Sequence, residues 1–270
     1  MDASADQKNP PPERPRIAYL FSRYPVVSQT FCDSEMLALE SRGFDLDIAS
    51  INPPPSAFRH ERFDQFEAEV FYPPPSRALG KLKSLREEDG SWQARFGAMI
   101  ARHDRDYGVS FKAATRARNG LYFAELFQKR GIRHVHVHFA NRATHTALFI
   151  KQWAGIPFSF TAHAQDFMVD LGSDDLLREL CREAEFVVGV SDFSCDLLRQ
   201  TCPDSAEKIT RVYNGIAMDQ FPTAPIEEFG PLRIISIGRL IEFKGFHHLI
   251  NACEKLRKRG IDFHWTLVGE

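Results

Sequence analysis

A strand–helix–strand pattern near the start of the chain constrains its fold more than any other feature. Residues 16–21 form an apolar run that is typical of a buried strand. Thr30 stands at a helix N-cap position with Asp33 in capping-box spacing, and apolar residues continue toward Gly43. Residues 44–51 alternate apolar and polar side chains, which predicts a second strand. Two strands joined by a helix run parallel in one sheet, because this connection is almost always a right-handed crossover.

The rest of the chain continues this alternation of strands and helices. A short strand is predicted around Val70 and Phe71, and a helical stretch over 81–133 follows it. The pattern then predicts helices over 144–154 and from Ser191 to about residue 200. It also predicts four strands, over 134–139, 157–161, 186–190 and 209–213. This order is typical of an α/β fold whose parallel sheet is covered by helices on both faces.

Composition divides the chain into four parts. The polar, proline-containing residues 1–15 are expected to form a disordered leader, and they lack the apolar core of a signal peptide. Residues 16–213 are expected to form one Rossmann-like domain, and 214–231 have the Gly, Pro and Asn content of a linker. Residues 232–270 begin a second strand–helix–strand unit. Because three elements cannot cover both faces of a parallel sheet, we expect a domain that is truncated there.

Charge and cysteine content exclude several classes of protein. A formal net charge of −2 and the lack of a helix-turn-helix, RNA-recognition or zinc-finger pattern argue against nucleic-acid binding. Five cysteines without a C-x-x-C pair favour a reducing compartment over a disulfide framework. Since no apolar run has the length of a membrane span, we expect a cytoplasmic protein, either free or peripheral at the inner face of the membrane.

The predicted helical stretch over 81–133 is basic. It contains twelve Lys and Arg against six Asp and Glu. A solvated helical face whose apolar side packs inward explains such an excess. The alternative is a patch that contacts anionic lipid or a lipid-linked acceptor, which would make the protein a peripheral membrane protein.

Two cations, Arg239 and Lys244, lie between the strand predicted at 232–238 and the helix predicted at 246–259. Open α/β sheets bind ligands at the carboxyl ends of their strands. A guanidinium grips two phosphate oxygens, an ammonium adds a point charge, and the helix N-terminus adds a positive dipole. The segment therefore predicts a diphosphate site, although a surface loop with two unrelated cations explains the same residues.

The run SIGRLIEFKGFHHLINA, which contains both cations, resembles the donor-site signature of glycosyltransferase family 4. The segments YPVVSQTF, HVHVHFA, FSFTAHAQD, VGVSDFS and VYNGIAMDQFP are similar to the same family in the same order along the chain. The exopolysaccharide and colanic-acid type members share the first three of these. The resemblance covers about residues 16–270.

This resemblance implies a GT-B fold, with an acceptor-side Rossmann-like domain followed by the incomplete start of a nucleotide-sugar-binding domain. It implies a retaining hexosyltransferase-type enzyme that moves a sugar from a nucleotide-diphosphate sugar to a saccharide or lipid-linked acceptor in polysaccharide biosynthesis. No metal or other cofactor is expected. Because the family's paired glutamates would lie beyond residue 270, the fragment itself is expected to be inactive.

The resemblance also assigns roles to individual residues. Arg239 and Lys244 would hold the diphosphate of the donor, and His163 would face the reacting centre as the catalytic residue. The loop over 22–30, which lacks the double glycine of many family members, would line the acceptor side. The residues expected around the acceptor are Ser28, Thr30 and Asp166.

Two other functions fit parts of the sequence. His134, His136 and His138 alternate along one strand and so share one face, as in some strand-borne metal sites. His163 and Asp166 would complete the ligands of a metal-dependent hydrolase, but the family resemblance explains the same run without a metal. Residues 16–230 would also suffice for a non-catalytic acceptor-binding module, although such a module has no use for the two cations near residue 240.

Overall fold

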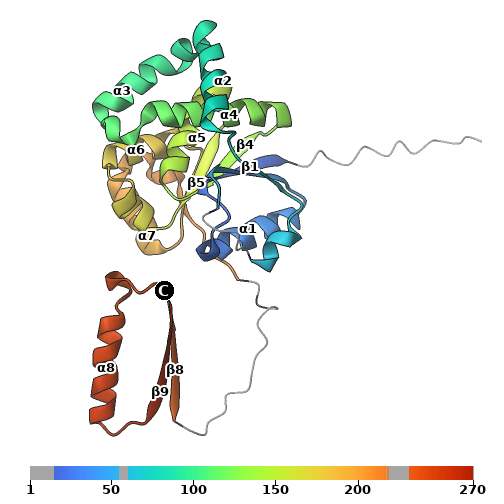
Figure 1. The fold of residues 1–270 in the computed structure, drawn as a ribbon. Helices are drawn as coiled ribbons and strands as arrows, with labels where there is room; N and C mark the ends of the chain where they lie inside the picture. Colours follow the sequence, from blue (N-terminus) through green and yellow to red (C-terminus); the bar gives the residue numbers. More distant parts are fainter. Residues whose placement is uncertain (1–14, 55–59, 217, 219–230, 270) are drawn as a thin grey trace, which may run out of the picture. The chain divides into compact units, whose positions relative to one another are not determined.

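The computed structural model describes residues 15–54, 60–216, 218 and 231–269, drawn in Figure 1. The chain divides into two compact units, residues 1–217 and 218–270. The predicted leader, apart from residue 15, and most of the predicted linker lie outside the described residues. Each unit contains its own parallel sheet.

The first unit is built on a seven-stranded parallel sheet, as the alternation of strands and helices predicts. The strand order is β3-β2-β1-β4-β5-β6-β7, so the chain builds one half outward from β1 and then starts again with β4 on its other side. The carboxyl ends of β1 and β4 therefore meet where the strand order reverses, which is where open α/β sheets bind ligands. The strands are β1 (Arg16–Arg23), β2 (Asp45–Asn52), β3 (Glu69–Phe71), β4 (His134–His138), β5 (Phe158–Ala162), β6 (Val187–Gly189) and β7 (Ile209–Arg211).

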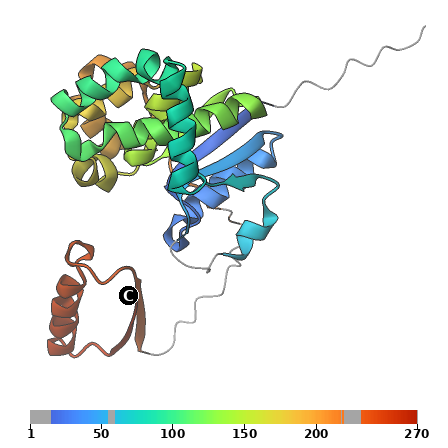
Figure 2. The same ribbon diagram turned by 45° about the horizontal axis from the view of Figure 1, so that its top comes forward.

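Helices cover both faces of this sheet, as Figure 1 and Figure 2 show. Helix α6 is not among the predicted helices, because charged residues dominate its short sequence. Among the described helices, none combines the length and the apolar character needed to cross a bilayer. The helices are α1 (Thr30–Glu40), α2 (Ser76–Glu88), α3 (Ala98–Asp106), α4 (Ala113–Arg130), α5 (Arg142–Ala154), α6 (Asp174–Glu183) and α7 (Asp192–Thr201), with short turns η1 (Val27–Gln29), η4 (Val109–Phe111) and η5 (Asp166–Asp170).

Alternation along the strands assigns the two faces of the sheet to two cores. Leu20 of β1 and Val137 of β4 pack into a large core with α4 and α5. Tyr19 of β1 packs on the other face with Met36 of α1. Because His138 alternates with Val137, it lies on the face that α1 covers. Polar residues of β4 are thereby placed under α1.

The start of α1 differs from the prediction. Thr30 is not the N-cap, because the turn η1 leads directly into the helix and puts Gln29 in that position, with no side-chain cap. Asp33 is buried and accepts a 2.6 Å hydrogen bond from the hydroxyl of Tyr24. It therefore ties α1 to the loop after β1 instead of completing a capping box. The predicted cap at Ser191 is correct, because its side chain accepts a hydrogen bond from the backbone of α7.

The basic stretch over 81–133 forms α2, α3 and α4, and many of its charges are used within the protein. Arg116, which forms no ion pair with a described residue, is buried. These contacts support the interpretation that the stretch is a packed helical face more than a lipid-binding patch. The ion pairs are Lys83–Glu87, Arg86–Glu125, Arg102–Glu179, Arg105–Asp106 and Arg130–Asp47.

The second unit contains the strand–helix–strand pattern that its sequence predicts. Strands β8 (Leu232–Ile237) and β9 (Phe263–Val268) are parallel and are joined through helix α8 (Phe246–Lys258). Ile235 and Ile237 of β8 are 64% and 74% exposed. The parallel pair therefore presents an apolar surface that the described residues do not cover.

Candidate active site at the strand ends

Polar side chains from β1, α1, β4 and the loop after β5 form a connected chain. Nδ1 of His138 lies 3.0 Å from Nε2 of His163. Nε2 of His138 lies 3.4 Å from Oε1 of Glu35, close enough for an ion pair but not aligned as a hydrogen bond. The hydroxyl of Tyr19 donates a 2.6 Å hydrogen bond to the same carboxylate oxygen. The chain of contacts runs from Tyr19 through Glu35 and His138 to His163.

The protonation states along this chain follow from burial and neighbouring charges. Burial alone would raise the pKa of Glu35, but the adjacent imidazole of His138, with smaller effects of His136 and Tyr19, lowers it to about 2. Glu35 is therefore a carboxylate at neutral pH. Burial and the neighbouring His138 lower the pKa of His163 to about 3. His163 is therefore a neutral imidazole at neutral pH.

The contact between His138 and His163 holds one hydrogen, either on Nδ1 of His138 or on Nε2 of His163. The other ring nitrogen of His163, Nδ1, makes no hydrogen bond to a described residue. His163 is thus a neutral imidazole whose Nδ1 is available to a polar group of a ligand.

Asp166 connects the two loops that follow β4 and β5. Its side chain is 3% exposed; Oδ2 accepts a 2.6 Å hydrogen bond from the backbone N–H of Ala140, and Oδ1 accepts one of 2.8 Å from that of His163. Burial raises the pKa of the Asp166 carboxyl, and these backbone hydrogen bonds oppose the rise. Phe139 and Ala164, in the same two loops, have left-handed backbones with φ of 76° and 78°. Asp166 thus fixes the backbone that carries His163.

We expect Asp166→Ala to destabilise the first unit by about 2–4 kcal/mol, because two buried N–H groups lose their acceptor. Urea denaturation at pH 7 measures this loss. The matched control is Asp170→Ala, at the exposed end of the same turn, which should change the stability by less than about 0.5 kcal/mol. Equal losses in the two variants would contradict the role given to Asp166.

The other predicted acceptor-side residues lie near this chain of contacts without joining it. Ser28 is exposed in η1, and Thr30 is the first residue of α1. Within the described residues no hydrogen bond links either side chain to His163. Phe31, which the sequence pattern does not single out, packs against His163 with ring centroids 4.8 Å apart. Glu35 follows Phe31 by one helical turn and so faces the same strand ends.

The three histidines of β4 have hydrogen-bond partners that explain them without a metal. Ser159 Oγ lies 2.7 Å from Nε2 of His134 and 2.8 Å from Nδ1 of His136. The second nitrogen of His136 lies 3.0 Å from Oγ1 of Thr161. A different set, Glu35 with His136 and His138, brings one potential ligand atom from each residue within 4.8 Å of the others. Metal binding by this set would compete with one of the two hydrogen bonds of His136.

We expect the purified protein to hold well under one equivalent of zinc per chain, because a metal ligand needs a lone pair that these hydrogen bonds already use. Elemental analysis after gel filtration measures the zinc content. Stoichiometric zinc that is lost from a His138→Ala variant would contradict this expectation. It would also restore the hydrolase hypothesis, with Glu35 in place of His134 as a ligand.

In the second unit, the two predicted donor-site cations lie at the start of α8. Arg239 follows β8, and Lys244 ends the turn η8 (Glu242–Lys244). Gly245, the N-cap of α8, has a φ of 73°, which suits glycine. Both cations are exposed, and neither forms an ion pair with a described residue. Two available cations beside the N-terminus of a 13-residue helix suit a diphosphate.

The sequence model of Glycosyltransferase Family 4 matches residues 29–220 of the chain. The chain belongs to glycosyltransferase family 4. The resemblance read from the sequence motifs is therefore confirmed, and the matched residues include β4, His163 and Asp166. The family model ends before Arg239 and Lys244, so the roles of these two cations stay predictions.

Two named glycosyltransferases are similar to almost the whole chain. WcaL of Escherichia coli, named as a colanic acid biosynthesis glycosyltransferase, is 23% identical over 278 residues, which cover 94% of the chain and 64% of WcaL. The amylovoran biosynthesis glycosyltransferase AmsK of Erwinia amylovora is 24% identical over 273 residues, with the same two coverages. The chain thus spans 64% of the length of these two relatives.

Solved structures confirm the fold class. The Anabaena protein HepE, in complex with UDP and glucose, aligns with a TM-score of 0.55 at 16% identity, over 95% of the chain and 69% of HepE. A glycosyltransferase of Rickettsia africae aligns with a TM-score of 0.57 at 14% identity, over 95% of the chain and 61% of that protein. Together with the parallel sheet and its helices, these alignments show an α/β fold of the GT-B type.

Proposed function

We propose that the protein is a retaining, hexosyltransferase-type member of family 4 that transfers a sugar from a nucleotide-diphosphate sugar to a saccharide or lipid-linked acceptor. The observation that carries this proposal is the pair Arg239 and Lys244 at the N-terminus of α8, in a chain of this family. The complex of HepE with UDP supports a nucleotide donor. The names of WcaL and AmsK support a place in polysaccharide biosynthesis.

The two cations supply the chemistry that this reaction needs most. Breaking the bond between the sugar and the donor leaves negative charge on the diphosphate. Arg239, Lys244 and the dipole of α8 stabilise that charge, and each well-placed donor of this kind contributes about 3 kcal/mol to lowering a barrier. We propose that this replaces a metal ion in the reaction.

His163 is proposed to hold a sugar hydroxyl and not to transfer a proton. Its pKa of about 3 makes it a weak base, and Nδ1 of its half-buried ring makes no hydrogen bond to a described residue. Glu35 and Tyr19 act through His138 as positioning residues. Asp166 is proposed to act in the same indirect way, through the backbone of His163.

Calorimetric titration of UDP and GDP tests the proposal. Because the chain spans 64% of its two relatives, the titration is done both on this chain and on any longer product of the same reading frame. Binding of one nucleotide, with AMP as the negative control, supports a donor site. If neither protein binds either nucleotide, the donor site is wrong and an acceptor-binding module becomes the better description.

The cellular location and the membrane contact are also part of the proposal. We propose a cytoplasmic enzyme that meets its acceptor at the inner face of the membrane. The ion pairs within 81–133 leave this stretch with fewer available cations than its composition indicates. Any contact through these helices is therefore expected to be weak and to depend on the acceptor.

A further inference from the structure

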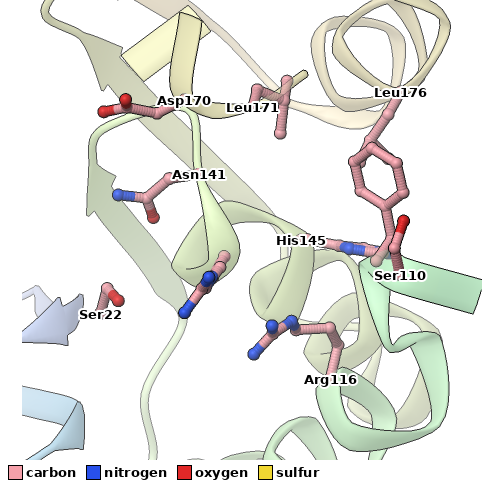
Figure 3. Close-up of a pocket in the computed structure, with 10 residues that line it drawn as sticks. Ser22, Ser110, Arg116, Asn141, His145, Asp170, Leu171 and Leu176 are labelled. Atoms are coloured by element: carbon pink, nitrogen blue, oxygen red, sulfur yellow. The ribbon is translucent and has the colours of Figure 1, made fainter. Parts of the chain in front are cut away.

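We propose that a cavity beside the strand ends of the first unit binds a phosphate group of the acceptor; this inference rests on the proposed transferase function. The cavity has a volume of about 520 Å³ and is shown in Figure 3. Ser22 at the end of β1, Asn141 before α5 and Asp170 at the end of η5 all line it, which places it at the carboxyl edge of the sheet. Arg116 of α4 and Arg142 of α5 line it as well.

Arg116 is the residue that points to an anion. It is 8% exposed, and its Nε is buried without a hydrogen-bond partner. No carboxylate of the described residues forms an ion pair with it. Burial and the nearby Arg142 lower the pKa of its guanidinium. A buried cation without a partner is costly, and an anionic ligand removes that cost.

A second cation and the N-terminus of a helix add to the positive electrostatic potential that Arg116 creates in the cavity. Arg142 is exposed and is the first residue of α5, a helix of 13 residues. The Asn141 side chain caps this helix by accepting a hydrogen bond from the backbone N–H of Ala143. The helix dipole and the available N–H groups of the first turn favour a negative charge there. The hydroxyls of Ser22 and Ser110 add two neutral donors to the cavity wall.

The balance of charges in the cavity is positive. Asp170 is the one carboxylate among the described lining residues, and it is exposed. Burial, His103 and Arg116 lower the pKa of His145 to about 3, so its imidazole is neutral at pH 7. Two guanidiniums therefore face one carboxylate. Several donors arranged around one anion suit a phosphate, which has three peripheral oxygens.

The wall of the cavity is held in place before any ligand binds. Nε2 of His145 lies 2.9 Å from Nδ1 of His103, and Nε2 of His103 lies 3.3 Å from Oε1 of Glu179. These contacts link α5 to α3 and α6. A site whose supporting side chains are already locked binds its ligand with less loss of entropy.

The phosphate has two possible sources, a lipid-linked acceptor and a soluble sugar phosphate. Val109 and Met168 are 76% and 51% exposed, on the turns η4 and η5 that also supply Ser110 and Asp170 to the wall. Exposed apolar side chains on these two turns suit the hydrocarbon of a lipid-linked phosphate. A water-soluble sugar phosphate presents the same anion without that hydrocarbon.

Binding to the full chain tests the site, with inorganic diphosphate, glucose 1-phosphate, farnesyl diphosphate and glucuronate as probes. We expect the phosphate probes to bind and to raise the melting temperature, and Arg116→Met to weaken this binding at least tenfold. The control is Arg105→Met, which removes the same charge from the exposed surface of α3 and should bind like the wild type. Without ligand, Arg116→Met should melt at the same or a higher temperature, because an unpaired buried charge is gone.

Each other outcome has a definite meaning. No binding of any phosphate probe, equal losses in the two variants, or a lower melting temperature of Arg116→Met without ligand would overturn the site. Binding of glucuronate alone would replace phosphate by carboxylate. Tighter binding of farnesyl diphosphate than of inorganic diphosphate identifies a lipid-linked source, and equal binding identifies a soluble one. Phosphate binding in a protein that binds neither UDP nor GDP would support the anion site and contradict the transferase proposal.

Discussion

Replacing Arg239 with alanine is expected to weaken UDP binding by about 10–100-fold, the value of one or two charge-assisted hydrogen bonds. Arg239 is exposed, forms no ion pair with a described residue and follows β8 after one glycine. Its guanidinium is therefore available to grip two oxygens of a diphosphate. Lys244→Ala should cost less, about 3–10-fold, because a lysine acts as a point charge without the bidentate geometry. Calorimetric titration with UDP measures both losses.

The control for these variants is Arg233→Ala. Arg233 lies near the amino end of β8, at the opposite end of the same strand, and is also exposed. Removing it changes the net charge of the unit by the same amount without touching the N-terminus of α8. An equal loss of affinity in Arg233→Ala and Arg239→Ala would reduce the proposed diphosphate site to a general charge effect. Raising the salt concentration should weaken that general effect more than the specific one.

Elements with strong local signals were predictable from the sequence alone. The strand–helix–strand pattern after residue 16, the cap at Ser191 and the three elements of the second unit all appear as predicted. These features depend on hydrophobic periodicity and turn chemistry, which neighbouring residues determine. The start of α1 was mispredicted. Threonine is a common N-cap residue, but the 3₁₀ turn η1 runs directly into α1 and makes Gln29 the N-cap in place of Thr30.

The partners of the site residues were not predictable in the same way. His163 and Asp166 could be named as site candidates from the sequence because they follow a predicted buried strand. Glu35 and Tyr19 carry no such signal, since their link to His138 depends on how α1 packs across β1 and β4. Arg116 is similar: the sequence shows one of twelve basic residues in a helical stretch, and only the fold shows that it is buried without a partner.

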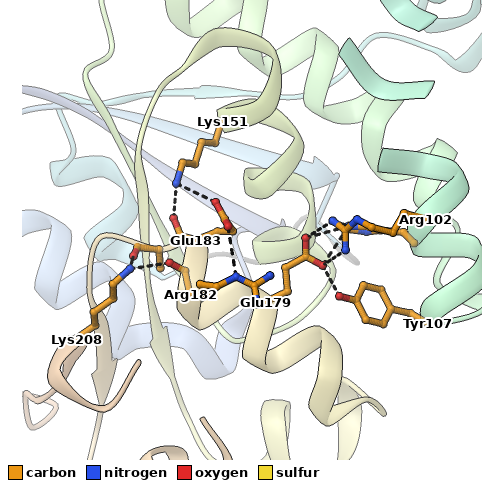
Figure 4. A network of polar contacts seen from close by, with 9 residues as sticks. Arg102, Tyr107, Lys151, Glu179, Arg182, Glu183 and Lys208 are labelled. Atoms are coloured by element: carbon orange, nitrogen blue, oxygen red, sulfur yellow. Dashed lines mark hydrogen bonds and ion pairs between the residues drawn. The ribbon is translucent and has the colours of Figure 1, made fainter. Parts of the chain in front are cut away.

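Replacing Glu179 with alanine is expected to destabilise the first unit by about 3 kcal/mol, because it leaves the buried His103 and two half-buried donors without their acceptor. Figure 4 shows Arg102 and Tyr107 converging on this carboxylate, and Arg102 Nη1 donates to its Oε2 over 3.1 Å. His103 lies 3.2 Å from the same oxygen. The value is at the lower end for a buried pair, since the Arg102 side chain is 37% exposed. Urea denaturation at pH 7 measures the loss.

The control is Glu183→Ala, one turn further along α6. Glu183 pairs with Lys151, but both side chains are about a third exposed, so this variant should lose less than about 1 kcal/mol. Similar losses in the two variants would show that the network around Glu179 contributes no more to stability than the pair of Glu183 and Lys151. Both changes remove the same carboxylate side chain from the same helix.

The dependence on pH separates the charge of Glu179 from its packing. Burial alone would raise the pKa of Glu179, but hydrogen bonds from His103, Arg102 and Tyr107 outweigh it and keep the pKa well below its ordinary value of 4.5. A carboxylate whose pKa is lower in the folded state contributes its full stability above that ordinary value and loses it as the pH falls below it. The difference in stability between the wild type and Glu179→Ala should therefore shrink as the pH falls below about 4.5. A difference that stays the same down to pH 3 would mean that Glu179 stabilises the unit by packing and not by its charge.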